Sequence, residues 1–295
     1  MSKMCERDQV GGGIRQEHIS VENSKSNTCV GNESTKCAES AAYIKKRLST
    51  LSPDEWDDFI RIYSNDARNA VQALVKQAEK KKAALLQEKE RTKRMYFFEE
   101  KYRDLGWICG IDEVGRGPLA GPVCAGAVIL PADEQILYLN DSKKLSEKRR
   151  EEMVPLIRAK AVAYATAFVS PERIDEINIL QATYEAMTAA VHALSERFHI
   201  RPNVLLIDAV HIPQLADYKQ VSIVKGDAQS ASIAAASIVA KVERDRLMKE
   251  YDKTYPVYGF AGNKGYGSAA HIEALRKYGP CQIHRNTFVN SVLSH

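Results

Sequence analysis

From residue 107 onward, short apolar runs alternate with longer helical segments, and this alternation limits what the chain can fold into. Five runs have the length and composition of strands: residues 107–112, 123–130, 161–169, 204–208 and 221–227. Helical patterns cover residues 179–198 and 230–251, and a last helix starts at Ser268 and stops at Gly279. We therefore expect one α/β domain in which helices flank a mixed five-stranded sheet.

The part of the chain before this domain has a different composition. Residues 1–38 contain few large apolar side chains, so they cannot bury enough surface to offset the entropy cost of ordering, and we expect them to be disordered. Residues 39–104 predict a helical appendage. Ser52, Pro53 and Glu55 encode a helix start, and apolar side chains then recur at helical spacing: Trp56, Phe59, Ile60, Tyr63, Val71, Leu74, Val75 and Ala78. The main domain would span residues 105–295.

A charged run over residues 79–104 extends this appendage toward the main domain. Such a run is commonly the solvated face of a helix. Alternatively, the basic residues between Lys80 and Arg94 form an arm that contacts nucleic-acid phosphates. The chain carries 42 basic and 38 acidic side chains, a net charge of +4, which suits a polyanionic partner without requiring one. Both interpretations stay open.

Composition excludes several classes of protein. The six cysteines are scattered, without a C-x-x-C pair or a zinc-like histidine spacing, so neither a metal–sulfur site nor a disulfide framework is expected. The sequence contains no run of about 18 apolar residues, the length needed to span a membrane. The first residues do not resemble a secretion signal. We expect a cytoplasmic protein with free thiols and no membrane partner.

Four carboxylates fall at the ends of predicted strands. Asp112 ends the first strand with Glu113 beside it, and the two later acids are Asp208 and Asp227. Each acid alone is commonly a turn or cap residue, but strand ends of an α/β sheet are where sites form. Clustered carboxylates repel one another and need a compensating cation. Oxygen ligands favour Mg²⁺ or Mn²⁺ over zinc, so the acids predict metal-assisted chemistry.

A glycine-punctuated loop, "GRGPLAGP", follows the adjacent acids. Gly115, Gly117 and Gly121 loosely imitate a dinucleotide-binding motif, but prolines intrude and the next element reads as a strand rather than a helix. The loop instead offers bare backbone that can approach a ligand closely, with Arg116 among rigid neighbours. Such a loop suits a sugar-phosphate backbone.

Several motifs occur in one order along the chain: "DEVGRGPLAGP", "NDSKKLS", "LLID", "KGD" followed by "SIAAASIVAKVERD", and "KGYGSAAH". In this order they resemble bacterial ribonuclease HII, the type 2 ribonuclease H, over about residues 105–288. The resemblance implies a ribonuclease H-like fold and a catalytic domain over residues 105–295. It also implies a metal-dependent endonuclease acting on RNA in RNA/DNA hybrids and on single ribonucleotides in duplex DNA.

The resemblance also assigns roles to individual residues. The family's catalytic metal ligands correspond to the four strand-end acids: Asp112, Glu113, Asp208 and Asp227. Its sensor of the ribose 2′-hydroxyl corresponds to Gly115, Arg116 and Gly117, and its junction-reading tyrosine to Tyr266. Ser268 stands where the family commonly has threonine and keeps the hydroxyl. Our mechanistic hypothesis is two Mg²⁺ or Mn²⁺ ions per site bridging the phosphate, with products that carry 5′-phosphate and 3′-hydroxyl ends.

Other polar residues in or near the motifs can be given either a structural or a functional role. We place Ser142, Lys143 and Lys144 on substrate phosphates, although a solvated loop before a helix capped by Ser146 explains them equally well. His271 and His284 are expected to be packing or surface residues rather than metal ligands. Asp141 is expected to be a turn residue, and Asp245 is expected to pair along its helix with Arg244, Arg246 or Lys249.

Two rival functions remain. The first is another ribonuclease H-fold nuclease, such as a four-acid exonuclease that acts at free ends. The second is a non-catalytic protein that binds RNA/DNA hybrids, although four acids oppose an anionic ligand unless a cation is present. The expected partners are RNA/DNA hybrid and ribonucleotide-containing duplex DNA, and we expect a monomer.

Overall fold

A mixed five-stranded sheet forms the centre of the main domain. The computed structural model describes residues 39–293, so the prediction for residues 1–38 lies outside the described residues. The sheet order is β3-β2-β1-β4-β5, with β1 antiparallel to β2, β2 antiparallel to β3, and β4 and β5 parallel to β1. The strands are β1 (Ile108–Val114), β2 (Val123–Ile129), β3 (Ala163–Val169), β4 (Val204–Asp208) and β5 (Lys219–Ile223). The predicted mixed sheet is confirmed.

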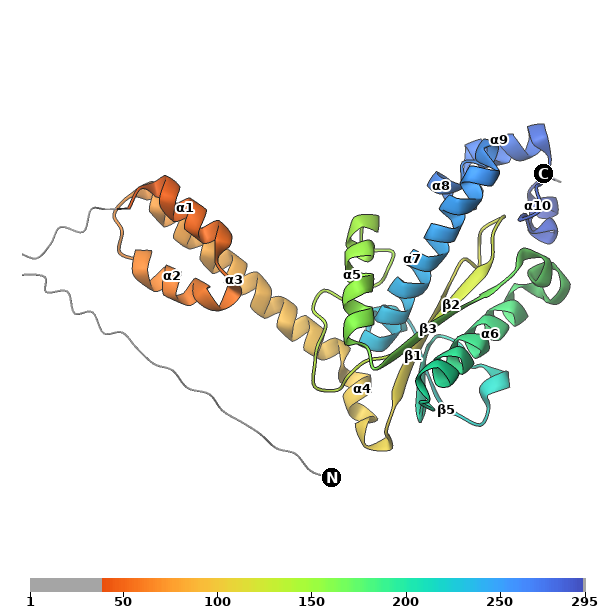
Figure 1. Ribbon diagram of the computed structural model, residues 1–295, viewed down its shortest axis with the longest axis horizontal. Coiled ribbons are helices and arrows are strands. Elements are labelled where there is room, and N and C mark those ends of the chain that lie inside the picture. The colour runs from red at the N-terminus through yellow and green to blue at the C-terminus, as the bar shows by residue number, and fades with distance from the viewer. Residues whose placement is uncertain (1–38, 294–295) are drawn as a thin grey trace, which may run out of the picture.

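Helices cover both faces of this sheet. The helix α6 (Pro171–Phe198) packs on β1, β2 and β3 from one side, while α7 (Ala231–Thr254) packs on β1 and β2 from the other (Figure 1). The helix α5 (Glu147–Lys160) lies against α7. At Gly110 and Gly126 a side chain would collide with the α7 backbone, 2.1 Å from the Ser232 carbonyl carbon and 2.4 Å from the Ala236 carbonyl oxygen. These glycines therefore let α7 lie directly on β1 and β2.

The helix α6 is interrupted at Asn178. This residue has φ +68°, and its side-chain oxygen accepts hydrogen bonds from the amides of Leu180 and Gln181 at 3.0 and 3.2 Å. Asn178 therefore caps the second segment. This agrees with the separate amphipathic stretch expected over residues 179–198.

After α7 the chain forms short elements around a small apolar core. They are η5 (Pro256–Tyr258), α8 (Phe260–Asn263), α9 (Ala269–Tyr278) and α10 (Asn286–Leu293). The predicted bounds of α9 are confirmed, with Ser268 as N-cap and Gly279 as C-cap. The expectation that α9 is the last helix is wrong, because α10 follows. Its first amides donate to Asp175, at 2.6 Å from Asn286 and 3.1 Å from Thr287.

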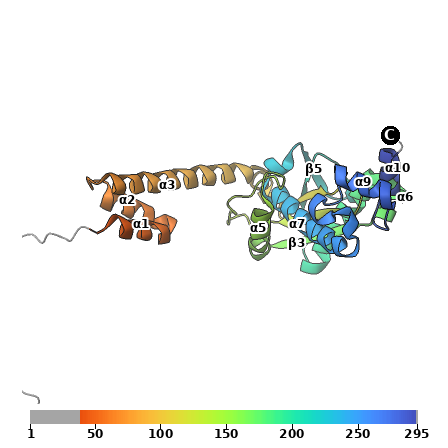
Figure 2. The same cartoon turned by 90° about the horizontal axis from the view of Figure 1, so that it is seen from above.

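The N-terminal helices form a bundle of their own. They are α1 (Ala41–Thr50), η1 (Pro53–Glu55), α2 (Trp56–Tyr63) and the long α3 (Asn69–Met95). Ser52 and Glu55 form the predicted capping box, with the Ser52 amide donating to Glu55 at 2.8 Å. Phe59 and Val71 belong to a separate apolar cluster, here called the distal bundle, made by α1, α2 and the first part of α3. Figure 2 shows α3 running from this bundle to the main domain.

The end of α3 and the short helix α4 (Phe97–Lys101), with η2 (Arg103–Leu105), join the appendage to the main domain. Met95 and Tyr96 are buried in the apolar core formed with α5, α7 and β2. The buried carboxylate of Glu99 accepts hydrogen bonds from the hydroxyl of Ser230 at 2.6 Å and the amide of Ser232 at 2.8 Å, at the start of α7. The appendage is thus anchored by the second half of α3, from Glu88 onward, and by the residues that follow it.

Candidate active site

Three of the predicted acids lie on neighbouring parallel strands. Asp112 and Glu113 are near the end of β1, and Asp208 is the last residue of β4. The register pairs Ile111 with Ile207, so Asp112 and Asp208 follow at the same level of the sheet. The Asp112 side chain accepts a hydrogen bond from the amide of Glu113 at 2.8 Å, which fixes its orientation.

The fourth acid is not at a strand end, contrary to our expectation. The strand β5 ends at Ile223, and Asp227 lies in the turn η4 (Gly226–Ala228). Lys225 adopts a left-handed conformation with φ +56°, and the amide of Gly226 donates to the Asp208 carboxylate at 2.7 Å. The turn therefore carries Asp227 back toward Asp208.

Burial and neighbouring negative charges raise the pKa values of three of the acids. Burial, together with the negative charges of Glu113 and Asp208, raises the pKa of Asp112 well above its usual range, although a hydrogen bond from Ser237 opposes the shift. Burial and Asp208 raise the pKa of Glu113, opposed by Arg116. Burial, Asp141 and Asp208 raise the pKa of Asp227. Asp208 thus stands near all three, and the cluster holds an excess of negative charge.

The donor set suits a hard divalent cation. Every candidate ligand is a carboxylate oxygen, which Mg²⁺ and Mn²⁺ prefer. A cation would offset both the burial and the repulsion that raise the pKa values of Asp112, Glu113 and Asp227. Within residues 39–293, no three histidine, cysteine or acidic side chains already stand in the arrangement of a formed metal site. The acids are neighbours rather than a closed coordination shell.

A cleft of about 340 Å³ opens beside Asp112 and Glu113. Its other walls are the predicted sensor loop and Tyr266, together with Ser142, Lys143, Ser237 and Lys241. Asp208 and Asp227 do not line it. The structure thus brings the loop and Tyr266 to the same cleft as the adjacent acids.

Two buried arginines, neither of which has a carboxylate ion pair within residues 39–293, hold the predicted sensor loop. Arg285 donates to the carbonyls of Gly115 at 2.6 Å and Arg116 at 2.8 Å, and Arg244 donates to the carbonyl of Pro122 at 2.8 Å. Burial lowers the pKa of Arg285 to about 9. Gly115 has φ +90°, and a side chain there would lie 2.1 Å from the Arg244 guanidinium. Sequence reasoning missed both arginines, since nothing local signals their distant carbonyl partners.

The predicted sensor residues differ in how tightly they are packed. The Arg116 guanidinium lies 3.2 Å from Glu113 and stays 43% exposed. Gly117 has ordinary backbone geometry, and a methyl there would meet only the Tyr266 ring, at 3.7 Å. Tyr266 is half-exposed, and its carbonyl accepts from the amide of Ser268 at 2.8 Å. The Ser268 hydroxyl in turn caps α9 by accepting a hydrogen bond from the backbone amide of His271 at 3.3 Å.

The "NDSKKLS" loop divides between two places. Ser142 and Lys143 line the cleft, whereas Lys144 faces a separate groove beside α3 and α4. Ser142 is buried, and its hydroxyl is hydrogen-bonded to Ser237 at 2.9 Å. Ser146 caps α5 as expected, with its hydroxyl accepting from the amide of Arg149. Of the two lysines in this loop, Lys143 is therefore the one that lines the cleft.

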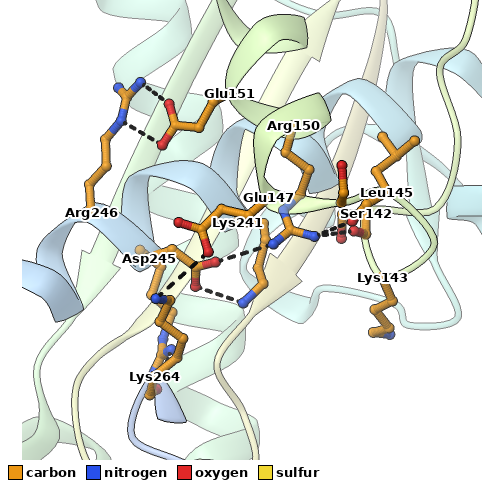
Figure 3. A network of polar contacts seen from close by, with 12 residues as sticks. Ser142, Lys143, Leu145, Glu147, Arg150, Glu151, Lys241, Asp245, Arg246 and Lys264 are labelled. Atoms are coloured by element: carbon orange, nitrogen blue, oxygen red, sulfur yellow. Dashed lines mark hydrogen bonds and ion pairs between the residues drawn. The ribbon is translucent and has the colours of Figure 1, made fainter. Parts of the chain in front are cut away.

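A polar network fixes this loop against α7 (Figure 3). Arg150 donates to the carbonyls of Ser142 and Leu145 at 2.8 and 2.6 Å. It also lies 3.6 Å from Asp245, which accepts from Lys241 at 2.6 Å. The expectation that Asp245 pairs with Arg244, Arg246 or Lys249 is wrong, because α5 packs against α7 and supplies Arg150. Lys241, in the cleft wall, is a further residue that sequence reasoning missed.

Asp141 has two surroundings. Its carboxylate accepts from the amide of Lys143 at 2.8 Å, so the predicted turn role is confirmed. It also raises the pKa of Asp227, which places a fifth acid next to the cluster. The position between Asn140 and the lysines gave no signal of this.

His271 and His284 pack as expected. Their Nε2 atoms lie 2.9 Å apart inside an aromatic cluster with Tyr258 and Phe260. Burial lowers the pKa of both rings, that of His284 to about 4. This buried ring pair supports α9, which carries His271.

Comparison with known proteins identifies the family. The sequence model described as "Ribonuclease HII" matches residues 109–291, and that described as "Ribonuclease HII N-terminal domain" matches residues 40–103. The chain belongs to the ribonuclease HII family. The second match shows that the appendage also has counterparts among ribonucleases HII, which the motifs alone did not reveal.

Individual relatives agree with this assignment. The chain is 54% identical over 232 residues to ribonuclease HII of Lachnoclostridium phytofermentans, covering 79% of this chain and 89% of the relative. It is 51% identical over 247 residues to ribonuclease HII of Bacillus subtilis, covering 83% and 94%. The crystal structure of ribonuclease H2 from Pyrococcus horikoshii superposes with a TM-score of 0.52 at 26% identity, covering 64% of this chain and 97% of that one.

The predicted ribonuclease H-like fold is therefore confirmed, and the chain is an enzyme of the ribonuclease H class, an endonuclease of RNA/DNA hybrids. This finding favours the ribonuclease H interpretation over the exonuclease and the non-catalytic binding protein. In the described part of the chain, no helix is both long and apolar enough to cross a membrane.

Proposed function

We propose that the chain is a divalent-metal-dependent endoribonuclease that cuts the RNA strand of hybrids and incises at ribonucleotides embedded in duplex DNA. The products carry 5′-phosphate and 3′-hydroxyl ends, and the enzyme works as a cytoplasmic monomer in ribonucleotide removal. The observation that carries this proposal is one cleft in which Asp112 and Glu113 face both the glycine loop and Tyr266. Residues 105–295 form the catalytic domain.

Asp112, Glu113, Asp208 and Asp227 would hold Mg²⁺ or Mn²⁺, with two ions per site. When bound, such ions polarise the scissile phosphate and lower the pKa of bound water. The support from this chain is that all four side chains are carboxylates and that the pKa values of Asp112, Glu113 and Asp227 are raised. Such a cluster repels an anionic substrate unless a cation is bound.

The remaining cleft residues would position the substrate. The Gly115–Gly117 backbone, held by Arg285, can approach a ribose closely enough to detect its 2′-hydroxyl. Tyr266 offers an exposed ring opposite Gly117 for the adjoining sugar or base. Lys143 and the exposed Arg116 supply positive charge for phosphates.

A closed circular duplex that contains one ribonucleotide tests the proposal. The chain should open the circle with Mg²⁺ or Mn²⁺ and leave it closed with chelator. End analysis should find a 5′-phosphate and a 3′-hydroxyl at the nick. An all-DNA circle is the control and should stay closed.

The result also separates the rivals. An enzyme that needs free ends would leave the ribonucleotide circle intact but degrade its linear form. A non-catalytic binding protein would bind the circular and the linear duplex without cutting either. Cleavage of RNA hybrid but not of the single-ribonucleotide circle would refute only the second half of the proposal.

A further inference from the structure

A second hollow, of about 500 Å³, lies where the appendage meets the catalytic domain. One wall is the end of α3 and the start of α4, which Figure 1 shows beside the catalytic domain. The opposite wall consists of Asn140 and Lys144 from one loop and Ala228 and Gln229 from another. We call this hollow the junction groove.

Hydrogen bonds between the appendage and the main domain hold the two walls in place. Glu88 accepts a hydrogen bond from the amide of Tyr138 at 2.6 Å, and Arg91 donates to the carbonyl of Leu139 at 2.6 Å. Farther along, Glu99 binds the start of α7 through Ser230 and Ser232. Because these contacts span both walls, the groove is formed before any ligand arrives and little ordering cost remains for binding.

The groove carries cations that the fold does not neutralise. Arg91 is paired with Glu88 at 2.7 Å and so serves the structure. Arg94 and Lys144 line the groove too, but among residues 39–293 neither side chain has an ion pair or hydrogen bond. Phe97, which also lines the groove, leaves 58% of its surface exposed. Unpaired cations beside an exposed ring are suited to a nucleic-acid strand.

Residues that line the groove are sequence neighbours of residues at the candidate active site. Lys144 directly follows Lys143, which lines the cleft, and Gln229 lies two residues after Asp227. We propose that the junction groove binds the sugar-phosphate backbone of the substrate on one side of the cleavage site. Arg94 and Lys144 contact phosphates, and Phe97 lies against a sugar or base. This inference rests on the proposed function, since it extends that same substrate.

Binding of duplexes with one ribonucleotide, measured in chelator, tests the groove independently of cleavage. The variants are Arg94→Ala, Lys144→Ala and Phe97→Ala, with Arg94→Lys to retain the charge. Lys76→Ala is the matched control, because Lys76 is an exposed, unpaired cation in the described chain, on the same helix but about 27 Å from Arg94 along its axis.

Each lost phosphate contact should make the dependence of log affinity on log salt shallower by about 0.9. The affinity ratio of wild type to Arg94→Ala or Lys144→Ala should therefore shrink about 3.5-fold between 50 and 200 mM salt. Phe97→Ala should bind about 5-fold or more weakly with an unchanged salt slope. Arg94→Lys should restore the slope, and Lys76→Ala should match wild type.

Substrate length gives a second readout. The duplex can be shortened from the end that occupies the groove. Once it no longer reaches the groove, Arg94→Ala should bind it as well as wild type does. Shortening the other end should leave the affinity difference between the two proteins unchanged. Equal losses of affinity in Lys76→Ala and Arg94→Ala would overturn the proposed groove. They would indicate instead that the positive charge of α3 attracts the duplex without a specific contact. Unchanged affinity and slope in all three alanine variants would overturn nucleic acid as the occupant.

Failure of the groove and failure of the proposed function are distinguishable. If wild type leaves the ribonucleotide circle closed with Mg²⁺ or Mn²⁺, the proposed incision is wrong, whatever the binding data show. If wild type opens the circle but the groove variants bind normally, only the groove is wrong.

Discussion

The candidate active-site cleft and the distal bundle bury opposite kinds of side chain. The bundle buries apolar groups such as Ile44, Phe59 and Val71, whose removal from water stabilises it. The cleft buries Asp112 beside Glu113, and both groups have raised pKa values because their charges are desolvated and close together. Burial of the acids therefore lowers stability at the predicted site, whereas the bundle is stabilised by its own apolar core.

The end of α3 belongs with the catalytic domain in this comparison. Met95 and Tyr96 lie in its core, and Glu99 holds the start of α7 just after the turn that carries Asp227. Sequence proximity to the bundle therefore misleads about which region these residues serve. The five predictions below test how independent the two regions are.

The largest effect should come from truncation. Deleting residues 1–98 removes Met95 and Tyr96 from the catalytic core, so this protein should not fold. Deleting residues 1–84 removes the distal bundle but keeps the contacts from Glu88 onward, so this protein should fold and cleave at saturating enzyme. Circular dichroism melting and single-turnover cleavage measure both. A folded, active 1–98 deletion would show that the end of α3 is not part of the catalytic core.

Phe59→Ala should destabilise only the bundle. The ring is buried, and its loss should cost about 3–5 kcal/mol of bundle stability. Hydrogen exchange should accelerate over residues 41–78, while single-turnover cleavage stays at the wild-type rate. If exchange accelerates equally in the sheet, the two regions unfold together and the comparison fails.

Asp208→Asn should have the reverse effect. An amide is a poor ligand for a hard cation, so turnover at low metal concentration should fall by at least about 100-fold. The melting temperature should hold, because the change is nearly isosteric. Turnover near the wild-type value would remove Asp208 from the site.

The sensor loop offers a matched pair of glycines. A methyl at Gly117 meets only the Tyr266 ring at 3.7 Å, so Gly117→Ala should fold normally and depress cleavage about 10-fold while duplex binding changes less. Gly115→Ala should destabilise the protein for two reasons. The added methyl would collide with Arg244, and Gly115 has φ +90°, which alanine rarely adopts. Equal losses of cleavage and binding in Gly117→Ala would indicate a structural glycine.

The smallest effect concerns stability and pH. Since the pKa of Asp112 is raised in the folded state, that state binds more protons than the unfolded chain above about pH 4, and unfolding free energy in chelator should decrease as pH rises. Asp112→Asn should weaken this decrease and melt higher than wild type at neutral pH, although it should not cleave. Denaturant unfolding across pH in EDTA checks the sign. A lower melting temperature would mean that the Asp112 carboxylate stabilises the fold.

The sequence by itself determined features that depend on neighbouring residues. The strand runs, the capping box of Ser52 and Glu55, and the caps of α5 and α9 are local, because backbone hydrogen bonds and side-chain periodicity act over a few residues. The four acids could be chosen because three of them end or nearly end strands. Their roles, like those of the sensor loop, remain predictions.

Only the tertiary structure decided which distant groups meet. A left-handed turn at Lys225, rather than a strand end, carries Asp227 to Asp208. Arg244 and Arg285 find carbonyl partners more than 100 residues away, and Lys144 turns from the cleft to the junction groove. A buried charge must find partners wherever packing brings polar atoms, and sequence periodicity carries no record of those pairings.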